Sequence, residues 1–128
     1  MKRIRVACAI IENENGVLVV QRSSKMMLPL KWEFPGGKIE KHENEEECII
    51  REIHEELHLD IKVLRKLNST LYDYPNFSLE LIPFIAMRIG GQIILSEHND
   101  YHYFKKEELL NLDWAEADIP IVKQYLSL

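Results

Sequence analysis

The segment Arg51-Glu52-Ile53-His54-Glu55-Glu56 is the part of the sequence best suited to chemistry. On a helix, Glu52, Glu55 and Glu56 lie at i, i+3 and i+4, so the three carboxylates share one arc. Arg51 is the one lysine or arginine between residues 44 and 57. Converging carboxylates are hard ligands for Mg²⁺ or Mn²⁺, and such a metal binds phosphate oxygens and activates water. The alternative interpretation is a solvated acidic face.

A helix over residues 44–57 positions these carboxylates. Asn44 can cap its first turn, and Glu47 three residues later completes a capping-box pattern. The apolar positions that we expect to form the buried face are Ile49, Ile50, Ile53 and Leu57. The glutamates border this face and lie late in the helix, where the helix dipole disfavours anions. Both features favour a metal site over a solvated surface.

The other expected elements make a mixed sheet with helices packed on it. Residues 3–12 are apolar and β-branched and predict a buried strand, with 17–21 returning from a turn at 12–16. Residues 23–31 predict a loop, and 32–34 a short extended piece that Pro35-Gly36-Gly37 ends through unusual backbone angles. The remaining predictions are long strands at 61–71 and 78–89 around a 74–76 turn, short strands at 92–95 and 101–104, and helices at 105–110 and from Asp118 onward.

Length and composition set further limits. With 128 residues and 15.1 kDa, we expect a single domain over 1–128. A net charge of −5 argues against binding a nucleic-acid polymer, which requires a basic face. Cys8 and Cys48 lack metal or disulfide spacing and are expected to be buried free thiols. No apolar run approaches the roughly 20 residues that span a membrane, so we expect a cytoplasmic protein, either a monomer or a homodimer.

The spacing around the acidic segment resembles the Nudix box. Gly37 is followed after five residues by Glu43, and after seven more by Arg51-Glu52. The match then continues through Glu55-Glu56 and fails only at the last glycine, which is His58 here. A non-glycine residue in a left-handed helix end costs about 1 kcal/mol, so we expect a strained or rebuilt helix end.

Two further stretches are similar to MutT-like nucleoside triphosphate pyrophosphohydrolases. They are Trp32–Glu40 and Glu97–Pro120, so the resemblance covers nearly the whole chain. It implies an α+β fold, an α-β-α sandwich in which a central mixed sheet is flanked by the catalytic helix and a C-terminal helix. It also implies hydrolysis of nucleoside triphosphates, oxidised or modified ones included, to a monophosphate and pyrophosphate.

The resemblance assigns roles to the acidic residues. Glu52, Glu55 and Glu56 would bind Mg²⁺ or Mn²⁺ with the Gly36 carbonyl, while Glu43 and Arg51 orient the carboxylates. The family also uses an acid from the loop before residue 101, for which Glu97 is favoured over Asp100 and His102. The full catalytic set is thus Glu43, Arg51, Glu52, Glu55, Glu56 and Glu97.

Substrate contacts are implied as well. Lys38 and Arg22 match phosphate-contacting positions, although the two cations could be ordinary surface residues, and Gly37 beside Lys38 is also expected to bind substrate. Phe34 would pack on the base or belong to the core, and Asp118 would bond the base edge or cap the last helix. The partner is therefore a small nucleotide. The alternatives are another nucleoside diphosphate-linked substrate, such as ADP-ribose, a dinucleoside polyphosphate or a nucleotide sugar, and a catalytically silent binding module.

Overall fold

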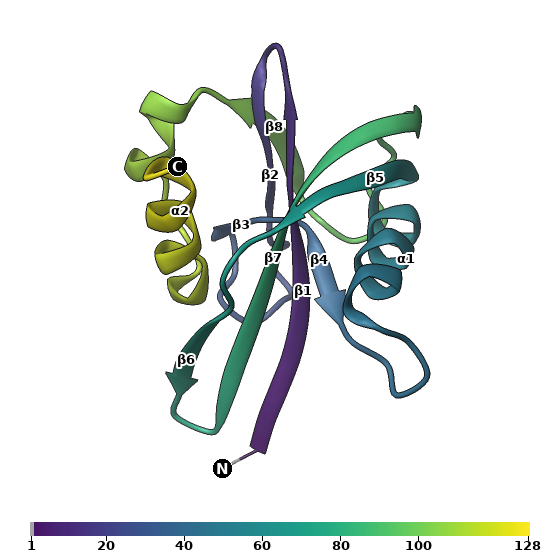
Figure 1. The fold of residues 1–128 in the computed structure, drawn as a ribbon. Coiled ribbons are helices and arrows are strands. Elements are labelled where there is room, and N and C mark those ends of the chain that lie inside the picture. Colours follow the sequence, from purple (N-terminus) through teal and green to yellow (C-terminus); the bar gives the residue numbers. More distant parts are fainter. Residues whose placement is uncertain (1) are drawn as a thin grey trace.

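The computed structural model describes residues 2–128 as three layers (Figure 1). Helix α1 (Glu45–Leu57) covers one face of the central sheet and helix α2 (Ile119–Leu126) covers the other. This arrangement is the expected α-β-α sandwich. Among the described residues, no helix is both long and apolar enough to cross a lipid bilayer.

The sheet is mixed because one central pair of strands is parallel and the others are antiparallel. Its main path runs β3-β2-β1-β7-β5, with β4 paired to β1, β6 to β7 and β8 to β2; β1 and β7 form the parallel pair. The strands are β1 (Lys2–Asn13), β2 (Gly16–Gln21), β3 (Trp32–Glu33), β4 (Gly36–Lys38), β5 (Leu59–Lys66), β6 (Thr70–Tyr74), β7 (Phe77–Gly91) and β8 (Asp100–Phe104). Two 3₁₀ helices, η1 (Lys106–Asn111) and η2 (Glu116–Asp118), precede α2.

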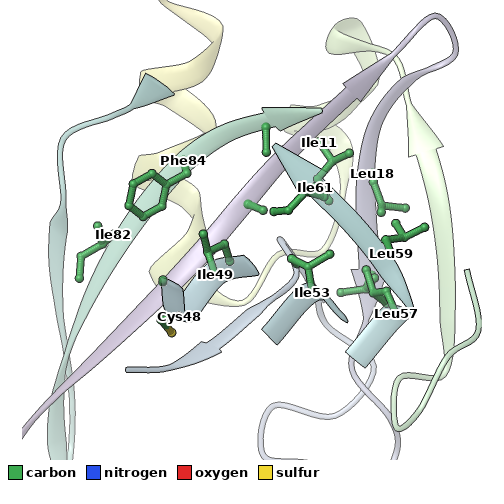
Figure 2. Packing of buried hydrophobic residues seen from close by; sticks show 14 residues of the cluster. Ile11, Leu18, Cys48, Ile49, Ile53, Leu57, Leu59, Ile61, Ile82 and Phe84 are labelled. Atoms are coloured by element: carbon green, nitrogen blue, oxygen red, sulfur yellow. The ribbon is translucent and has the colours of Figure 1, made fainter. Parts of the chain in front are cut away.

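The middle of strand β1, residues 7–11, is buried on both faces, as the central part of a sandwich strand must be. Ala7, Ala9 and Ile11 pack with α1 in the cluster of Figure 2. Cys8 and Ile10 alternate with them and pack with α2 on the opposite side. Successive side chains thus enter two cores on opposite faces of the sheet. The strand expected at 3–12 is confirmed, with its burial limited to residues 7–11. The two cysteines of the chain are both buried and free, also as expected.

Helix α1 begins as predicted, but its buried face differs from the expected one. The capping box is present: Asn44 Oδ1 accepts from the Glu47 amide at 2.7 Å, and the Glu47 carboxylate accepts from the Asn44 amide at 2.9 Å. The prediction that Ile50 is buried is wrong, because it is 40% exposed and Cys48 is buried in its place. The buried arc is thus rotated toward Cys48, and it includes the directions in which Glu52 and Glu56 project.

The strand predicted at 61–71 is two strands, β5 and β6, both paired with β7. They separate beside Pro83, whose carbonyl accepts from the Leu67 amide at 2.9 Å. Proline has no N–H to return a bond, so the ladder cannot continue through this point. The predicted 74–76 turn and the strand following it are confirmed by the β6–β7 hairpin.

Two other predicted elements are also corrected. Residues 92–95 form no strand, since this segment bonds to the end of α1 instead of to the sheet: the Ile94 amide donates to the Leu57 carbonyl at 3.0 Å. The helix expected at 105–110 is the 3₁₀ helix η1. Lys105 lies just before it, and the amide of Lys105 donates to the side chain of Glu108 at 2.8 Å.

The glycines at 36 and 37 do not end a strand through unusual angles, as the sequence suggested. Both lie in β4, paired with Cys8 and Ala7 of β1, and neither has a positive φ. Their role is close approach: a Cβ added at Gly36 would lie 2.0 Å from the Ala7 carbonyl oxygen. Glycine is needed here for space rather than for conformational freedom.

We expect Gly36→Ala to reduce the free energy of unfolding by about 3 kcal/mol or more, because the new methyl group meets backbone that cannot move aside. Urea denaturation measures the change. Gly90→Ala is the matched control, since its added Cβ would lie 3.3 Å from the side chain of Asp60, an exposed residue, and should change stability by no more than about 1 kcal/mol. Equal effects at the two positions would contradict the close-approach argument.

Candidate active site

Arg51 lies at the centre of the acidic cluster. Its Nε and Nη2 donate to the two oxygens of Glu43 at 2.9 and 2.6 Å, and Nη1 donates to Glu52 at 2.8 Å and to Glu55 at 3.0 Å. The hydrogen bonds from the Arg51 guanidinium lower the pKa of the Glu43 carboxyl to about 2. Nη2 also reaches the Lys38 carbonyl at 3.3 Å, which ties the helix to β4. Arg51 therefore orients two carboxylates of the acidic segment and joins them to the neighbouring strand.

Glu52 and Glu56 are largely withdrawn from water. Their side chains are 13% and 22% exposed, and this burial raises the pKa of both carboxyls, with smaller contributions from the neighbouring acids. Glu52 also lies against Gly37, where an added Cβ would come within 2.1 Å of Oε2. Partly buried carboxylates of like charge repel one another unless a cation offsets them.

The donor set suits a hard divalent cation, because it consists of carboxylate oxygens beside a strand without side chains at Gly36 and Gly37. Among residues 2–128, no three acidic, histidine or cysteine side chains are already gathered as ligands. Arg51 holds Glu52 and Glu55, while Glu56 faces another partner. Metal binding would therefore require Glu52 and Glu55 to turn part of the way from Arg51.

The three candidates for an additional acid lie in different places. Glu97 is near enough to Glu56 for its charge to raise the pKa of that carboxyl further. Asp100 starts β8 and accepts from the Tyr101 amide at 2.8 Å. His102 pairs with Val19, whose side chain belongs to the α2 core, so His102 lies on the face of the sheet away from α1. Glu97 is thus the candidate brought to the acidic cluster.

Sequence reasoning missed His98, which is a buried part of this cluster. The His98 side chain is 6% exposed; Nε2 lies 2.8 Å from a Glu33 oxygen and Nδ1 lies 3.8 Å from Glu56 Oε2. The one sequence signal for it was its place beside Glu97. That signal is weak, because its partner Glu33 is 65 residues away along the chain.

His58 adopts the left-handed conformation of the glycine it replaces, with φ 58° and ψ 31°. Its amide still donates to the His54 carbonyl at 3.0 Å, so the helix end is not rebuilt. Its ring Nδ1 lies 2.9 Å from the Ile94 carbonyl, which can accept from it. The side chain that creates the strain therefore also supplies a bond that offsets it.

That bond is one of several between the end of α1 and the loop that follows β7. The amide of Ser96 donates to the Glu56 carbonyl at 3.2 Å, and its hydroxyl donates to the Glu55 carbonyl at 2.9 Å. The last carbonyls of a helix have no hydrogen-bond donor within the helix, and here this loop supplies the donors. Glu97 and His98 follow directly, so their position depends on the end of α1.

A largely apolar cavity of about 290 Å³ lies on the α2 side of the sheet and reaches β4. Four of the five predicted substrate-binding residues line it: Arg22, Phe34, Gly37 and Asp118. Lys38 does not line it and is exposed at the end of β4. Tyr74 and Phe77, from the β6–β7 hairpin, also line the cavity with stacked rings 5.2 Å apart.

Phe34 and Asp118 are joined inside this cavity. The Phe34 amide donates to Asp118 Oδ2 at 2.9 Å, and the Phe34 ring packs on Trp114 with centroids 4.9 Å apart. Burial raises the pKa of the Asp118 carboxyl well above its usual range, and the nearby Glu33 raises it further. Asp118 does stand at the N-cap position of α2, as the alternative expected, but its side chain makes no capping bond there and bonds to Phe34 instead. Phe34 belongs to the core and to the cavity wall at once.

Arg22, another polar residue of the wall, is already engaged. Nη1 donates to Glu33 at 2.8 Å and Nε donates to the Met27 carbonyl at 2.6 Å. Arg22 is therefore a fixed part of the wall and not a freely moving surface cation.

Asp118→Asn should stabilise the protein at neutral pH by a few degrees in Tm, because ionising the buried carboxyl opposes folding. The folded pKa is raised, so the wild type loses stability as pH rises from about 4 through that pKa, whereas asparagine does not titrate. The Tm difference should therefore grow between pH 4 and pH 8 in thermal scans. Glu14→Gln, at an exposed position that makes no ion pair among residues 2–128, is the control and should give a Tm difference that stays nearly constant over this range. A flat profile for Asp118→Asn would contradict the prediction.

His58→Ala should lower stability by about 1 kcal/mol, since alanine keeps the left-handed strain and loses the ring bond to Ile94. His58→Gly loses the same bond but relieves the strain, so its free energy of unfolding should stay within about 0.5 kcal/mol of the wild type. Urea denaturation of the pair measures the difference. Equal losses in both variants would show that strain at His58 has no part in stability.

Known proteins resemble this chain over its full length. The model of the family described as the NUDIX domain matches residues 1–125. The chain is 30% identical over 128 residues to the CTP pyrophosphohydrolase of Escherichia coli strain K12, covering 100% of this chain and 95% of that protein. It is 31% identical over 123 residues to the 8-oxo-dGTP diphosphatase of the same strain, covering 95% of each.

A solved structure agrees with these sequence matches. The solution structure of the MutT protein from methicillin-resistant Staphylococcus aureus 252, described as a Nudix family hydrolase, is 41% identical. It superimposes with a TM-score of 0.79 over 99% of this chain and 98% of that one. The box spacing, the sandwich and these likenesses together show that the chain belongs to the Nudix hydrolase family.

Proposed function

We propose that this protein hydrolyses nucleoside triphosphates to a nucleoside monophosphate and pyrophosphate, as part of nucleotide-pool cleansing. The observation that carries the proposal is the position of Gly37. It lines the apolar cavity, and it also lies against the carboxylate of Glu52 on α1. A nucleotide whose base entered the cavity would thereby have its phosphate chain directed along β4 toward the acidic helix.

Nudix hydrolases generally use divalent metal ions. The proposed ion here is Mg²⁺ or Mn²⁺, and when bound it supplies Lewis acidity and an activated water. Its proposed ligands are the carboxylates of Glu52, Glu55, Glu56 and Glu97 and the carbonyl of Gly36. Support comes from the burial of Glu52 and Glu56, because negative charge held away from water needs a cation nearby.

The residues around these ligands orient the carboxylates or bind the phosphate chain of the substrate. Arg51, fixed by Glu43, keeps Glu52 and Glu55 from separating, so the carboxylates meet a cation in a limited set of positions. Lys38 is exposed beside the cluster, where its long side chain can reach a phosphate chain lying along β4. Arg22 is a weaker phosphate ligand in this proposal, because a phosphate would have to compete with Glu33 for the guanidinium.

Base recognition would fall to Phe34 and Asp118. The relatives act on CTP or 8-oxo-dGTP, as their names state, and cytosine and guanine both carry an exocyclic amino group that a carboxylate can accept from. The proposal therefore includes both bases, canonical or oxidised. We also propose a cytoplasmic location, which suits a substrate from the nucleotide pool and two free thiols.

A nucleotide panel with Mg²⁺ tests the proposal. Canonical, oxidised and methylated triphosphates are incubated with the protein, pyrophosphate is measured, and the nucleotide product is identified by mass. We expect stoichiometric monophosphate and pyrophosphate from CTP, 8-oxo-dGTP or a close relative. Single phosphate release, or no product from any member, would overturn the proposal.

The matched variant is Glu56→Gln, which keeps the shape of the side chain and removes its charge. We expect its kcat to fall by more than about a hundredfold, the loss of several kcal/mol of transition-state stabilisation. Glu46→Gln, at an exposed position in the first turn of the same helix, is the control and should retain wild-type turnover. Full turnover by Glu56→Gln would show that the acidic cluster is not catalytic and would revive the silent binding module.

A further inference from the structure

His98 lies between two carboxylates that belong to different parts of the site. Its imidazole Nε2 is 2.8 Å from Glu33 Oε2, and its Nδ1 is 3.8 Å from Glu56 Oε2. Glu33 belongs to β3 and lines the cavity, whereas Glu56 belongs to the acidic cluster on α1. The ring is therefore a second link, besides Gly37, between the cavity and the proposed metal site.

The nitrogen that faces Glu56 has no hydrogen bond. Among residues 2–128, Nδ1 of His98 and Oε2 of Glu116 are the buried side-chain polar atoms that lack a partner. Leaving such an atom unpaired costs about 1–3 kcal/mol, so a partner is expected to approach it. The gap of 3.8 Å exceeds a normal hydrogen bond by less than 1 Å, and a small rotation of the Glu56 side chain would close it. A carboxylate only accepts, so in this bond Nδ1–H of His98 donates to Glu56 while Nε2–H donates to Glu33.

The opposite end of the ring is held firmly. Glu33 accepts from His98 through one oxygen and from Arg22 Nη1 through the other at 2.8 Å. Arg22 is in turn bonded to the Met27 carbonyl, as described above. The backbone of His98 follows the segment bonded to the end of α1 by Ser96. Both the ring and its backbone are therefore fixed, so His98 is better placed to move Glu56 than to be moved by it.

We propose that His98 is a positioning residue that holds the Glu56 carboxylate in its metal-binding place. The series Arg22–Glu33–His98–Glu56 would then connect the contents of the cavity with the geometry of the metal site. This rests on the proposed function, in which Glu56 is a metal ligand. Groups that orient metal-binding carboxylates commonly change metal affinity by 10–100-fold when removed, about as much as some direct ligands.

Two amide substitutions separate the two nitrogens of the ring. The amide nitrogen of glutamine can occupy the place of Nε2, so His98→Gln keeps the bond to Glu33 and removes the group facing Glu56. The amide of asparagine corresponds to Nδ1, so His98→Asn keeps that group and gives up Glu33. A residue that only fills space would respond to the two substitutions alike.

The first experiment titrates the full chain with Mn²⁺ alone and follows free Mn²⁺ by electron paramagnetic resonance. We expect His98→Gln to bind Mn²⁺ about 10–100-fold more weakly than wild type. His98→Asn should recover most of that loss at a similar Tm. In steady state, His98→Gln should lower kcat more than it raises the KM for nucleotide. Wild-type Mn²⁺ affinity in His98→Gln, or equal losses in the two variants, would overturn the proposal.

The second experiment needs no metal. The ¹⁵N resonances of the His98 ring are recorded in the metal-free protein, where Glu56→Gln should shift Nδ1 and Glu33→Gln should shift Nε2. An Nδ1 resonance that Glu56→Gln leaves unchanged would overturn the proposed contact between His98 and Glu56. If the wild type bound no Mn²⁺, the proposed metal chemistry would fail, and these spectra would still decide whether His98 contacts the Glu56 carboxylate.

Discussion

One guanidinium holds together the most highly charged part of this protein. The acidic segment places three glutamates within two turns of α1, where their mutual repulsion opposes the helix that carries them. Arg51 offsets this repulsion with hydrogen bonds to Glu52 and Glu55. Glu43, in the preceding loop, fixes the orientation of the guanidinium. The same group reaches the Lys38 carbonyl, so the helix cannot carry its charge without also docking against β4. The same side chain therefore both offsets the charge of α1 and fixes the packing of α1 against β4.

The close approach of β4 to β1 and α1 places the acidic cluster next to the apolar cavity. Strand β4 lies so near β1 and α1 that side chains at positions 36 and 37 would collide with the Ala7 carbonyl and the Glu52 carboxylate. The absence of side chains there puts backbone on one wall of the cavity and beside the acidic cluster at the same time. A short strand whose first two residues have no side chain therefore connects a surface suited to a flat apolar ring with one suited to charge.

The sequence predicted those features that depend on neighbours along the chain. The alternation in β1, the capping box of α1 and the β6–β7 turn follow from local rules, and the structure agrees with them. The spacing from Gly37 to Glu56 predicted the family, and most of the predicted substrate contacts do line one cavity. The metal ligands themselves remain predictions.

The predictions that the structure corrects depend on contacts between residues that are distant along the chain. The break at Pro83 concerns a partner strand, and the 92–95 segment bonds to a helix end some 36 residues earlier. Ile50 fits the apolar wheel but lies outside the arc that the sheet covers. His98 was missed because its two carboxylates come from β3 and α1, and no local pattern marks a side chain whose partners are all distant.

The bond between the Phe34 amide and Asp118 spans 84 residues, and it is joined by two backbone bonds between residues 113–115 and Trp32. The C-terminal segment therefore completes the wall of a cavity whose other parts come from early in the chain. During synthesis on the ribosome, the acidic helix and its arginine are made well before this last segment emerges. The charged half of the site is then assembled while the apolar half is still open, so a nascent chain stopped short of residue 118 would carry the acidic cluster without a finished place for a base.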